Sequence, residues 1–390
     1  MHDVIVVGAG PAGSVLAYLL ARRGLDVVIL ERASLPRYKS CGGGVTWKAV
    51  QNLPFDASSV FEHQAIGGVV TYQGRQMLRV EVNQAIAWLV MRDKFDHFLA
   101  RQAVSAGARL QEETIAVKVE DKGDRVVVST TQGELQSQLL AGADGVNSRV
   151  AHTMGLLAKR EAGVALEAEV GVSPAALEKQ GAYVTFDFSA IAGGYGWIFP
   201  KRDHLSVGVF KASQGKANGL RQALEQFIAS QAVLTNPQVL HMQGHQIPLG
   251  GGKHALDKGR VLLVGDAANL ADPWIGEGIS YAIMSARLAA EQLAKAIENQ
   301  VFDLSGYTRL INASITPQLK TARLFAKVVF ALPQFSSDLL SRSPYLQQMV
   351  IDVIRGRRTF SEIAAAVVSG VPRVVTETIL HAQRLPINDR

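Results

Sequence analysis

The first 32 residues contain the pattern that most constrains the fold of this chain. Residues 3–32, DVIVVGAGPAGSVLAYLLARRGLDVVILER, begin with a β-branched apolar run at Val4–Val7. A helical pattern follows at Pro11–Arg23, and a second apolar run lies at Val27–Leu30. Two such strands joined by a helix form a βαβ unit, whose strands must be covered on both faces. The segment therefore predicts an α/β domain of the Rossmann type.

The turn inside this unit has the spacing of a dinucleotide fingerprint, with an acidic residue, Glu31, at the end of the second strand. Gly8 allows a tight turn, Gly10 lets the backbone approach a pyrophosphate, and Gly13 lets helix and strand pack closely. The helix N-terminus favours phosphate groups, and Glu31 can accept hydrogen bonds from ribose hydroxyls. The alternative is a βαβ unit whose glycines serve packing alone. The predicted cofactor residues here are Gly8, Gly10, Ala12, Gly13, Glu31 and Arg32.

Composition narrows the class of protein. The 390 residues are 48% hydrophobic and 19% charged, which is typical of a globular chain with two or three domains. The first apolar run lacks a basic flank, so it is not a signal peptide, and no run approaches the length of a membrane span. The single cysteine, Cys41, excludes an internal disulfide framework and favours the reducing cytoplasm.

Positive charge is concentrated in the last part of the chain. Residues 301–390 contain 11 Lys or Arg against 6 Asp or Glu, together with apolar helical stretches such as LFAKVVFAL. This combination favours a peripheral contact with the cytoplasmic face of an anionic membrane. A solvated basic face over ordinary core helices is the equal alternative. We expect no nucleic acid partner, because no binding motif or aromatic-basic platform is present.

The rest of the pattern predicts a discontinuous organisation. Residues 1–60, 90–160 and 255–300 are assigned to the nucleotide domain, which includes a helix at about Asp93–Ala106 and a long helix from about Gly276. Residues 61–89 and 161–254 are assigned to an inserted antiparallel β-sheet domain that binds substrate, with one helix near Gly219–Ser230. Residues 301–390 are expected to be helical, with breaks at the three prolines Pro333, Pro344 and Pro372.

Two further turns point to FAD as the dinucleotide. Asp144-Gly145 and Gly265-Asp266 each follow a strand, and a long cofactor benefits from a second anchor far away in sequence. Asp266 can accept hydrogen bonds from ribityl hydroxyls. The helix that begins near Gly276-Glu277-Gly278 would direct its positive end at the pyrimidine side of a flavin. This set adds Asp144, Gly265, Asp266, Gly276, Gly278 and Ile279 to the predicted cofactor site.

The motifs VGAGPAGS, GADGVNSRV and LLVGDAANLADPWIGEGI resemble those of the p-hydroxybenzoate hydroxylase-like flavoprotein superfamily over about the first 300 residues. The resemblance implies that Glu31 binds the AMP ribose and that Asp266 holds the ribityl chain. It also implies that Arg92, in the pattern R-x-x-F-D, contacts the cofactor. The alternative for Arg92 is a surface arginine at a helix end.

Two more segments resemble the geranylgeranyl reductase family: PRYKSCGGG at residues 36–44 and GYGWIFPKRDHLSVGV at residues 194–209. The resemblance implies an FAD-dependent reductase that saturates isolated double bonds in a prenyl chain of a lipid, quinone or chlorophyll precursor. It implies that Cys41, Gly42 and Gly43 lie at the flavin. Lys48 is a departure, because related motifs often carry arginine there.

The predicted catalytic residues are Cys41, Tyr195 and Trp197. Reduction of an unpolarised alkene needs a hydride and a proton, and aromatic faces can shelter the cationic character that develops on carbon. Tyr195 and Trp197 are two apart on a strand and therefore point to one side, with Phe199 in the same row. The alternatives are that the aromatic residues are sheet core and that Cys41 is an inert buried thiol.

Other flavoprotein activities remain open. A monooxygenase of an aromatic or quinone-like substrate would use the same FAD motifs, a halogenase fits less well, and a carotenoid cyclase or a lipid carrier would use FAD without net redox chemistry. The electron donor is NAD(P)H, docking transiently, or a reduced ferredoxin attracted by the basic surface. No metal site is expected, because His241 and His245 fall on a strand, where residues four apart lie far from each other.

Overall fold

The N-terminal unit forms the centre of the first sheet in the computed structural model, which describes residues 1–156, 161–212, 219–366, 374, 376 and 377. Strand β1 (His2–Val7) pairs in parallel with β2 (Val27–Leu30), and helix α1 (Pro11–Ala21) connects them. All four residues of β2 are buried, as expected for a strand that is covered on both faces.

Strands from distant parts of the chain complete this first sheet. Its order is β17-β18-β11-β1-β2-β8, and the hairpin β9-β10 adds to β11. The strands are β8 (Arg109–Gln111), β9 (Ala116–Asp121), β10 (Val126–Thr130), β11 (Gly133–Gly142), β17 (Asp257–Lys258) and β18 (Val261–Leu263). Because β18 pairs in parallel with β11, the chain returns to the first sheet after leaving it for about a hundred residues.

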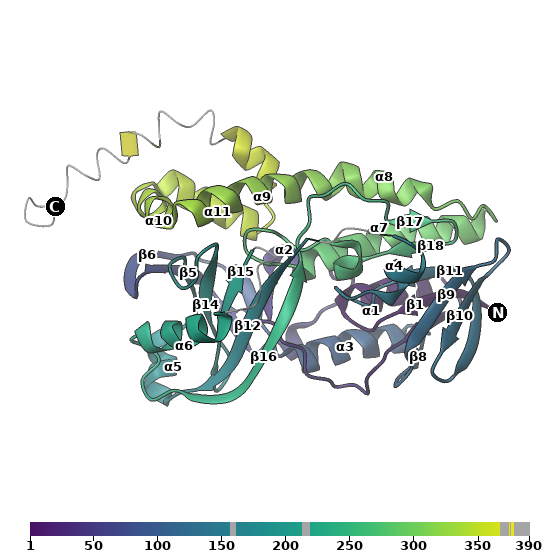
Figure 1. The fold of residues 1–390 in the computed structure, drawn as a ribbon, viewed down its shortest axis with the longest axis horizontal. Coiled ribbons are helices and arrows are strands. Elements are labelled where there is room, and N and C mark those ends of the chain that lie inside the picture. Colours follow the sequence, from purple (N-terminus) through teal and green to yellow (C-terminus); the bar gives the residue numbers. More distant parts are fainter. Residues whose placement is uncertain (157–160, 213–218, 367–373, 375, 378–390) are drawn as a thin grey trace, which may run out of the picture.

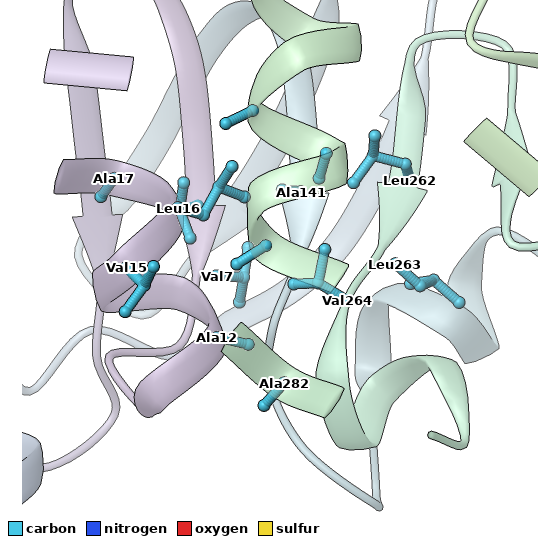
Figure 2. Close-up of a cluster of buried hydrophobic side chains, with 14 of the residues drawn as sticks. Val7, Ala12, Val15, Leu16, Ala17, Ala141, Leu262, Leu263, Val264 and Ala282 are labelled. Carbon is cyan, nitrogen blue, oxygen red and sulfur yellow. The ribbon is translucent and has the colours of Figure 1, made fainter. Parts of the chain in front are cut away.

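Several helices pack around the first sheet. Among them are α1, α3 (Arg92–Ser105) and α7 (Ile279–Glu298), with the short α4 (Arg149–Thr153) after β11. Figure 2 shows α1 beside α7, and their small side chains Ala12 and Ala282 allow the close approach. Ser148 caps α4 as its residue type suggests, because its hydroxyl accepts a hydrogen bond from the Ala151 amide at 2.9 Å.

The second sheet lies on the opposite side of the molecule in Figure 1. Its order is β16-β12-β15-β14-β13-β5-β6. The strands are β5 (Gly67–Tyr72), β6 (Arg75–Glu81), β12 (Ala162–Gly171), β13 (Tyr183–Asp187), β14 (Gly194–Pro200), β15 (Leu205–Lys211) and β16 (Gln238–Pro248). The expectation of a purely antiparallel sheet is wrong at one pairing, because β13 lies parallel to β5. β5 comes from an earlier segment, where it forms a hairpin with β6, so no local hairpin joins it to β13.

One face of the second sheet is covered by helices α5 (Pro174–Gln180) and α6 (Leu220–Ser230). Leu224 and Phe227 of α6 pack against Ile198 and Val207 of the sheet. The other face carries aromatic side chains. A third, small sheet, with the order β3 (Gly44–Thr46), β7 (Ala87–Leu89), β4 (His63–Ala65), lies near helix α2 (Trp47–Asn52) and the 3-10 turn at Ser58–Val60.

Helices form the C-terminal region, as predicted. They are α8 (Ser305–Ser314), α9 (Thr316–Ala331), α10 (Pro333–Arg342) and α11 (Pro344–Ile354), and they lie along one side of the molecule, above both sheets in Figure 1. Pro333 and Pro344 are each the first residue of a new helix, which confirms two of the predicted breaks. The third, Pro372, is outside the described residues. Within the described part of the chain, no helix has the length and apolarity needed to cross a bilayer.

Candidate active site

A cavity of ≈ 470 Å³ connects the glycine turn with the aromatic face of the second sheet. It is also lined by the loop before β3 and by the segment that precedes α7. The predicted site residues on its wall are Gly8, Gly10, Ala12, Glu31, Arg32, Cys41, Gly42, Gly43, Arg92, Asp144, Tyr195, Trp197, Asp266, Gly276, Gly278 and Ile279. Gly13 and Gly265 are not on this wall. The fold thus brings together residues that are up to 270 positions apart in sequence.

The three glycines of the turn have different surroundings. Gly8 has φ +108°, a conformation that glycine adopts without strain. A Cβ on Gly13 would lie 1.9 Å from the Gly8 carbonyl oxygen, so Gly13 is required for packing of α1 on the turn. A Cβ on Gly10 would meet no protein atom within 4 Å, although Gly10 lines the cavity. The free space at Gly10 is therefore available to a ligand.

Glu31 is held at the end of β2 with its carboxylate directed at the turn. Its Oε2 accepts a hydrogen bond from the Ala9 amide at 2.9 Å, and its Oε1 accepts one from the Ala33 amide at 3.2 Å. Arg37 Nε lies 3.4 Å from the same Oε1. These bonds fix the carboxylate beside the glycine turn, where a nucleotide ribose would lie.

Arg92 is buried, which rules out the surface-arginine alternative. It is the first residue of α3, and its guanidinium makes two hydrogen bonds to Asp96, at 2.8 and 3.0 Å. Burial alone would lower the pKa of Arg92, but the Asp96 carboxylate more than compensates, so the net pKa is raised. Arg37 also donates to Asp96, at 3.1 Å. The site thus contains a fixed positive charge, and its contact with the cofactor stays a prediction.

The second anchor lies at the start of α7. Asp266 belongs to a 3-10 turn at Gly265–Ala268 and lines the cavity. The helix begins at Ile279, three residues later than predicted, because Gly276 has φ +68° and cannot continue a helix. The buried Asp272 shapes this loop by accepting hydrogen bonds from the Trp274 and Ile275 amides at 2.7 and 3.3 Å.

Asp144 has one carboxylate oxygen free among the described residues. Its Oδ2 accepts hydrogen bonds from the Arg149 and Val150 amides at 2.6 and 3.1 Å. Its Oδ1 is buried without a protein partner, which is costly unless a ligand donates to it. Together with the open space at Gly10, this oxygen shows that the residues present fit a dinucleotide such as FAD.

An aromatic wall closes the other end of the cavity. Tyr195, Trp197 and Phe199 form one row on β14, with ring centroids 6.3 and 6.4 Å apart, as the period of a strand predicts. Phe186 and Phe210 pack against Tyr195 at 5.4 and 5.3 Å. All five rings line the cavity, and Tyr195, Trp197 and Phe210 also belong to a buried core cluster, so the contact of these rings with a substrate stays a prediction.

The glycine run after Cys41 is held close to the cavity by a buried lysine. Lys201, at the end of the aromatic strand, donates hydrogen bonds to the carbonyls of Gly42 and Val90 at 2.8 and 2.7 Å. A Cβ on Gly43 would lie 2.1 Å from the Val90 oxygen, so a side chain there would force the loop away. The Cys41 thiol is partly buried and accepts a weak bond from the Gly43 amide at 3.4 Å.

Several polar residues of the site were missed by the sequence analysis. His245 of β16 reaches the cavity and accepts a hydrogen bond from Lys39 Nζ at 2.9 Å. Burial and the nearby cations, Lys39 first, lower the pKa of His245 to about 3. Glu167 also lines the cavity. Only the alternation of polar residues on β12 and β16 could have indicated these side chains. Among the described residues, no His, Cys, Asp and Glu group is arranged to bind a metal.

Comparison with known proteins agrees with this geometry. The FAD binding domain family matches residues 1–303. A digeranylgeranylglycerophospholipid reductase of Methanopyrus kandleri is 32% identical over 76% of this chain and 81% of its own length. An uncharacterized protein of Methanosarcina barkeri is 31% identical over 87% of this chain and 86% of its own length. A geranylgeranyl bacteriochlorophyll reductase-like protein from Thermoplasma acidophilum, of solved structure, has a TM-score of 0.80 at 24% identity and covers 97% of this chain.

The fold and the cofactor cradle define an FAD-dependent oxidoreductase, and the predicted α/β architecture with a helical C-terminal region is confirmed. The chain belongs to the geranylgeranyl reductase family of the p-hydroxybenzoate hydroxylase-like flavoproteins.

Proposed function

We propose that this protein uses reduced FAD to saturate isolated carbon–carbon double bonds in the prenyl chain of a lipid. The observation that carries the proposal is that one cavity joins the FAD cradle to a wall of aromatic side chains. Relatives named digeranylgeranylglycerophospholipid reductase support the same substrate class. The head group and the number of reduced bonds are not specified by any residue of the wall.

The bound cofactor and the aromatic side chains have different roles in the proposed reaction. When bound, reduced FAD supplies the hydride for one alkene carbon. Tyr195, Trp197 and Phe199 offer a ring surface that binds the apolar chain and shelters cationic character on the other carbon. Tyr195 is fixed by donating a hydrogen bond to the Ile275 carbonyl. The close aromatic packing keeps water away from the reacting carbons.

We also propose a peripheral membrane contact and a transient electron donor, either NAD(P)H or a reduced ferredoxin. Four large apolar side chains on α9, on α10 and between them are more than half exposed: Leu324, Val328, Leu332 and Phe335. The exposed Lys320 and Lys327 accompany them on α9. This combination suits an anionic bilayer, in which a prenyl lipid would itself reside.

The test is mass spectrometry of isoprenoid lipid and quinone side chains from cells with and without the gene. We expect side chains that gain two hydrogens for each double bond reduced. A Gly10→Val variant, whose side chain would enter the cofactor end of the cavity, is the control and should give no product. A product that gains an oxygen atom would instead support a monooxygenase, and unchanged side chains in every lipid would contradict the proposal.

A further inference from the structure

Two buried carboxyl groups lie close together beside the aromatic wall, on the same face of the second sheet. Glu167 and Glu169 are two apart on β12, so they point to the same face of the sheet, and they are 1% and 7% exposed. Two adjacent carboxyl groups in a dry environment rarely both remain ionised near neutral pH. Their partners show which of the two keeps the proton.

Glu169 has the partners of a carboxylate. His204 Nε2 lies 3.0 Å from Glu169 Oε2, and the Tyr38 hydroxyl donates to Oε1 at 3.4 Å. Burial lowers the pKa of His204, but its bonds to Glu169 and Asp203 reverse this and raise it, which favours a charged pair. Asp203 is 82% exposed and links His204 to solvent.

Glu167 has the partners of a neutral acid. Within the described part of the chain, no cationic nitrogen lies within 4.0 Å of it. Lys201 also faces the two carboxyl groups, but its Nζ is bonded to the carbonyls of Gly42 and Val90. Burial, followed by the charge of Glu169, raises the pKa of Glu167.

The hydrogen bonds leave one oxygen of Glu167 able to carry a proton, the one that faces Ser40. The Trp197 indole N–H, which can only donate, points at Ser206 Oγ at 3.3 Å. Ser206 must therefore donate its own proton to Glu167 Oε1, at 2.6 Å. The other oxygen, Oε2, lies 2.9 Å from Ser40 Oγ, which can in turn donate to the Gln243 carbonyl at 3.1 Å.

We propose that Glu167 is the proton donor of the reductase. The Ser40 hydroxyl turns from the Gln243 carbonyl to the cavity, gives its own proton to the alkene and takes the proton of Glu167 Oε2 in its place. Ser40 and Glu167 both line that cavity, next to Cys41. The alkene gains a hydride, with its electron pair, from the bound reduced cofactor. The second carbon gains the proton, and Glu167 is left as a carboxylate that is reprotonated from solvent. Glu169 and His204 are positioning residues, because the negative charge of Glu169 keeps Glu167 protonated and the pairing with His204 keeps Glu169 ionised.

The first test does not depend on turnover and uses infrared spectroscopy of the FAD-loaded protein near neutral pH. Wild type minus Glu167→Gln should show the carbonyl band of a protonated carboxyl, which shifts in D₂O. The difference removes contributions from other buried acids such as Asp272, whose pKa burial raises to about 6. Glutamine can keep both serine contacts, so the fold should persist. If the difference spectrum contains no such band, Glu167 is ionised and the proposal fails.

The second test is the anaerobic rate at which a geranylgeranyl lipid reoxidises the reduced flavin. Glu167→Gln and Ser40→Ala should slow this rate by about 10²-fold or more, because a positioned acid is lost. In the wild type the rate should fall as pH rises through the pKa of Glu167. Glu169→Gln should move this fall to lower pH, because the neighbouring negative charge is removed.

The matched control is Asp187→Asn, a buried carboxyl on β13 of the same sheet that binds Thr71 and Ser189 and does not line the cavity. It should leave both rate and pH profile unchanged. Full activity in Glu167→Gln would overturn the proton-donor role. The proposal rests on the proposed function in one respect, because the acceptor of the proton is the prenyl alkene. If wild-type flavin is never reoxidised by prenyl lipid while the infrared band is present, the reductase reading fails and the protonated state of Glu167 is supported.

Discussion

Cys41 is the only thiol of the chain, and it stands on the cavity wall between Ser40 and the glycine run. If Cys41 takes part in the reaction, as predicted, then Cys41→Ser should keep FAD bound and lower turnover by about tenfold or more. Bound FAD is measured by absorbance and turnover by product mass. Undiminished turnover in this variant would show that Cys41 only fills space.

His245 gives the site a pH dependence of stability. Its pKa is lowered to about 3 by burial and by Lys39, so the His245 imidazole is neutral in the native protein. In the unfolded chain the imidazole takes up a proton at its ordinary pKa. Stability should therefore fall as pH drops below about 6.5, by ~2 kcal/mol at pH 5 from this residue.

The measurement is denaturant unfolding between about pH 5 and 7, in wild type and in His245→Gln. In the variant, the free energy of unfolding should fall less steeply as pH drops, because the unfolded chain no longer takes up a proton at residue 245. An identical pH slope in both proteins would mean that His245 is protonated in the native state.

Single residues were predictable where the motif is local. The positions of Gly8, Glu31 and the row Tyr195–Trp197 follow from strand period and turn chemistry. Glu167, His245 and Lys201 were missed, because their proximity depends on how β12, β16 and β14 lie in the second sheet. That register is set by long-range pairing and has no local signature.

At the level of single elements, two glycines at the start of α1 have different roles: Gly13 serves folding and Gly10 serves cofactor binding. Gly13→Ala places a Cβ 1.9 Å from the Gly8 oxygen and should destabilise the FAD-stripped protein by more than ~2 kcal/mol. Gly10→Ala meets no protein atom, and its φ of −75° suits alanine, so stability should change by less than ~1 kcal/mol.

Gly10→Ala should affect the binding of FAD and leave the stability of the fold nearly unchanged. Gly10→Ala should fold normally and still bind FAD more weakly, because its methyl group enters the cavity where the backbone meets the pyrophosphate. Urea unfolding and titration with FAD measure the two effects. Wild-type FAD affinity in Gly10→Ala would show that the turn is not the phosphate site.

Elements were predicted well where periodicity is strong. The βαβ unit, the hairpin β9-β10 and the proline-led helices α10 and α11 lie where the sequence indicates. The parallel pair β13-β5 was not foreseen, because it joins segments more than a hundred residues apart. The start of α7 was placed three residues early, because the left-handed Gly276 belongs to the preceding loop.

At the scale of the whole molecule, the exposed apolar side chains of α9 and α10 should direct the protein to anionic bilayers. Leu324→Ser with Val328→Ser should lower binding to vesicles of phosphatidylglycerol and phosphatidylcholine by at least about tenfold, because apolar burial is lost. High salt should weaken wild-type binding through Lys320 and Lys327.

The control is Val239→Ser with Leu240→Ser, which removes two equally exposed apolar side chains from β16 in the second sheet. Vesicle cosedimentation measures both variants. Equal loss of binding in the two double variants would show that the contact is unspecific, and wild-type binding in the first would place the membrane contact elsewhere.

In the proposed function, the cofactor cradle and the aromatic wall form one chamber for prenyl reduction. The most direct measurement is an anaerobic single turnover, in which the enzyme with fully reduced FAD is mixed with a geranylgeranyl lipid while flavin absorbance is recorded. We expect the oxidised flavin spectrum to return without oxygen, and each turnover to yield a lipid that is two hydrogens heavier. Flavin that stays reduced in the presence of the lipid would contradict the proposed function.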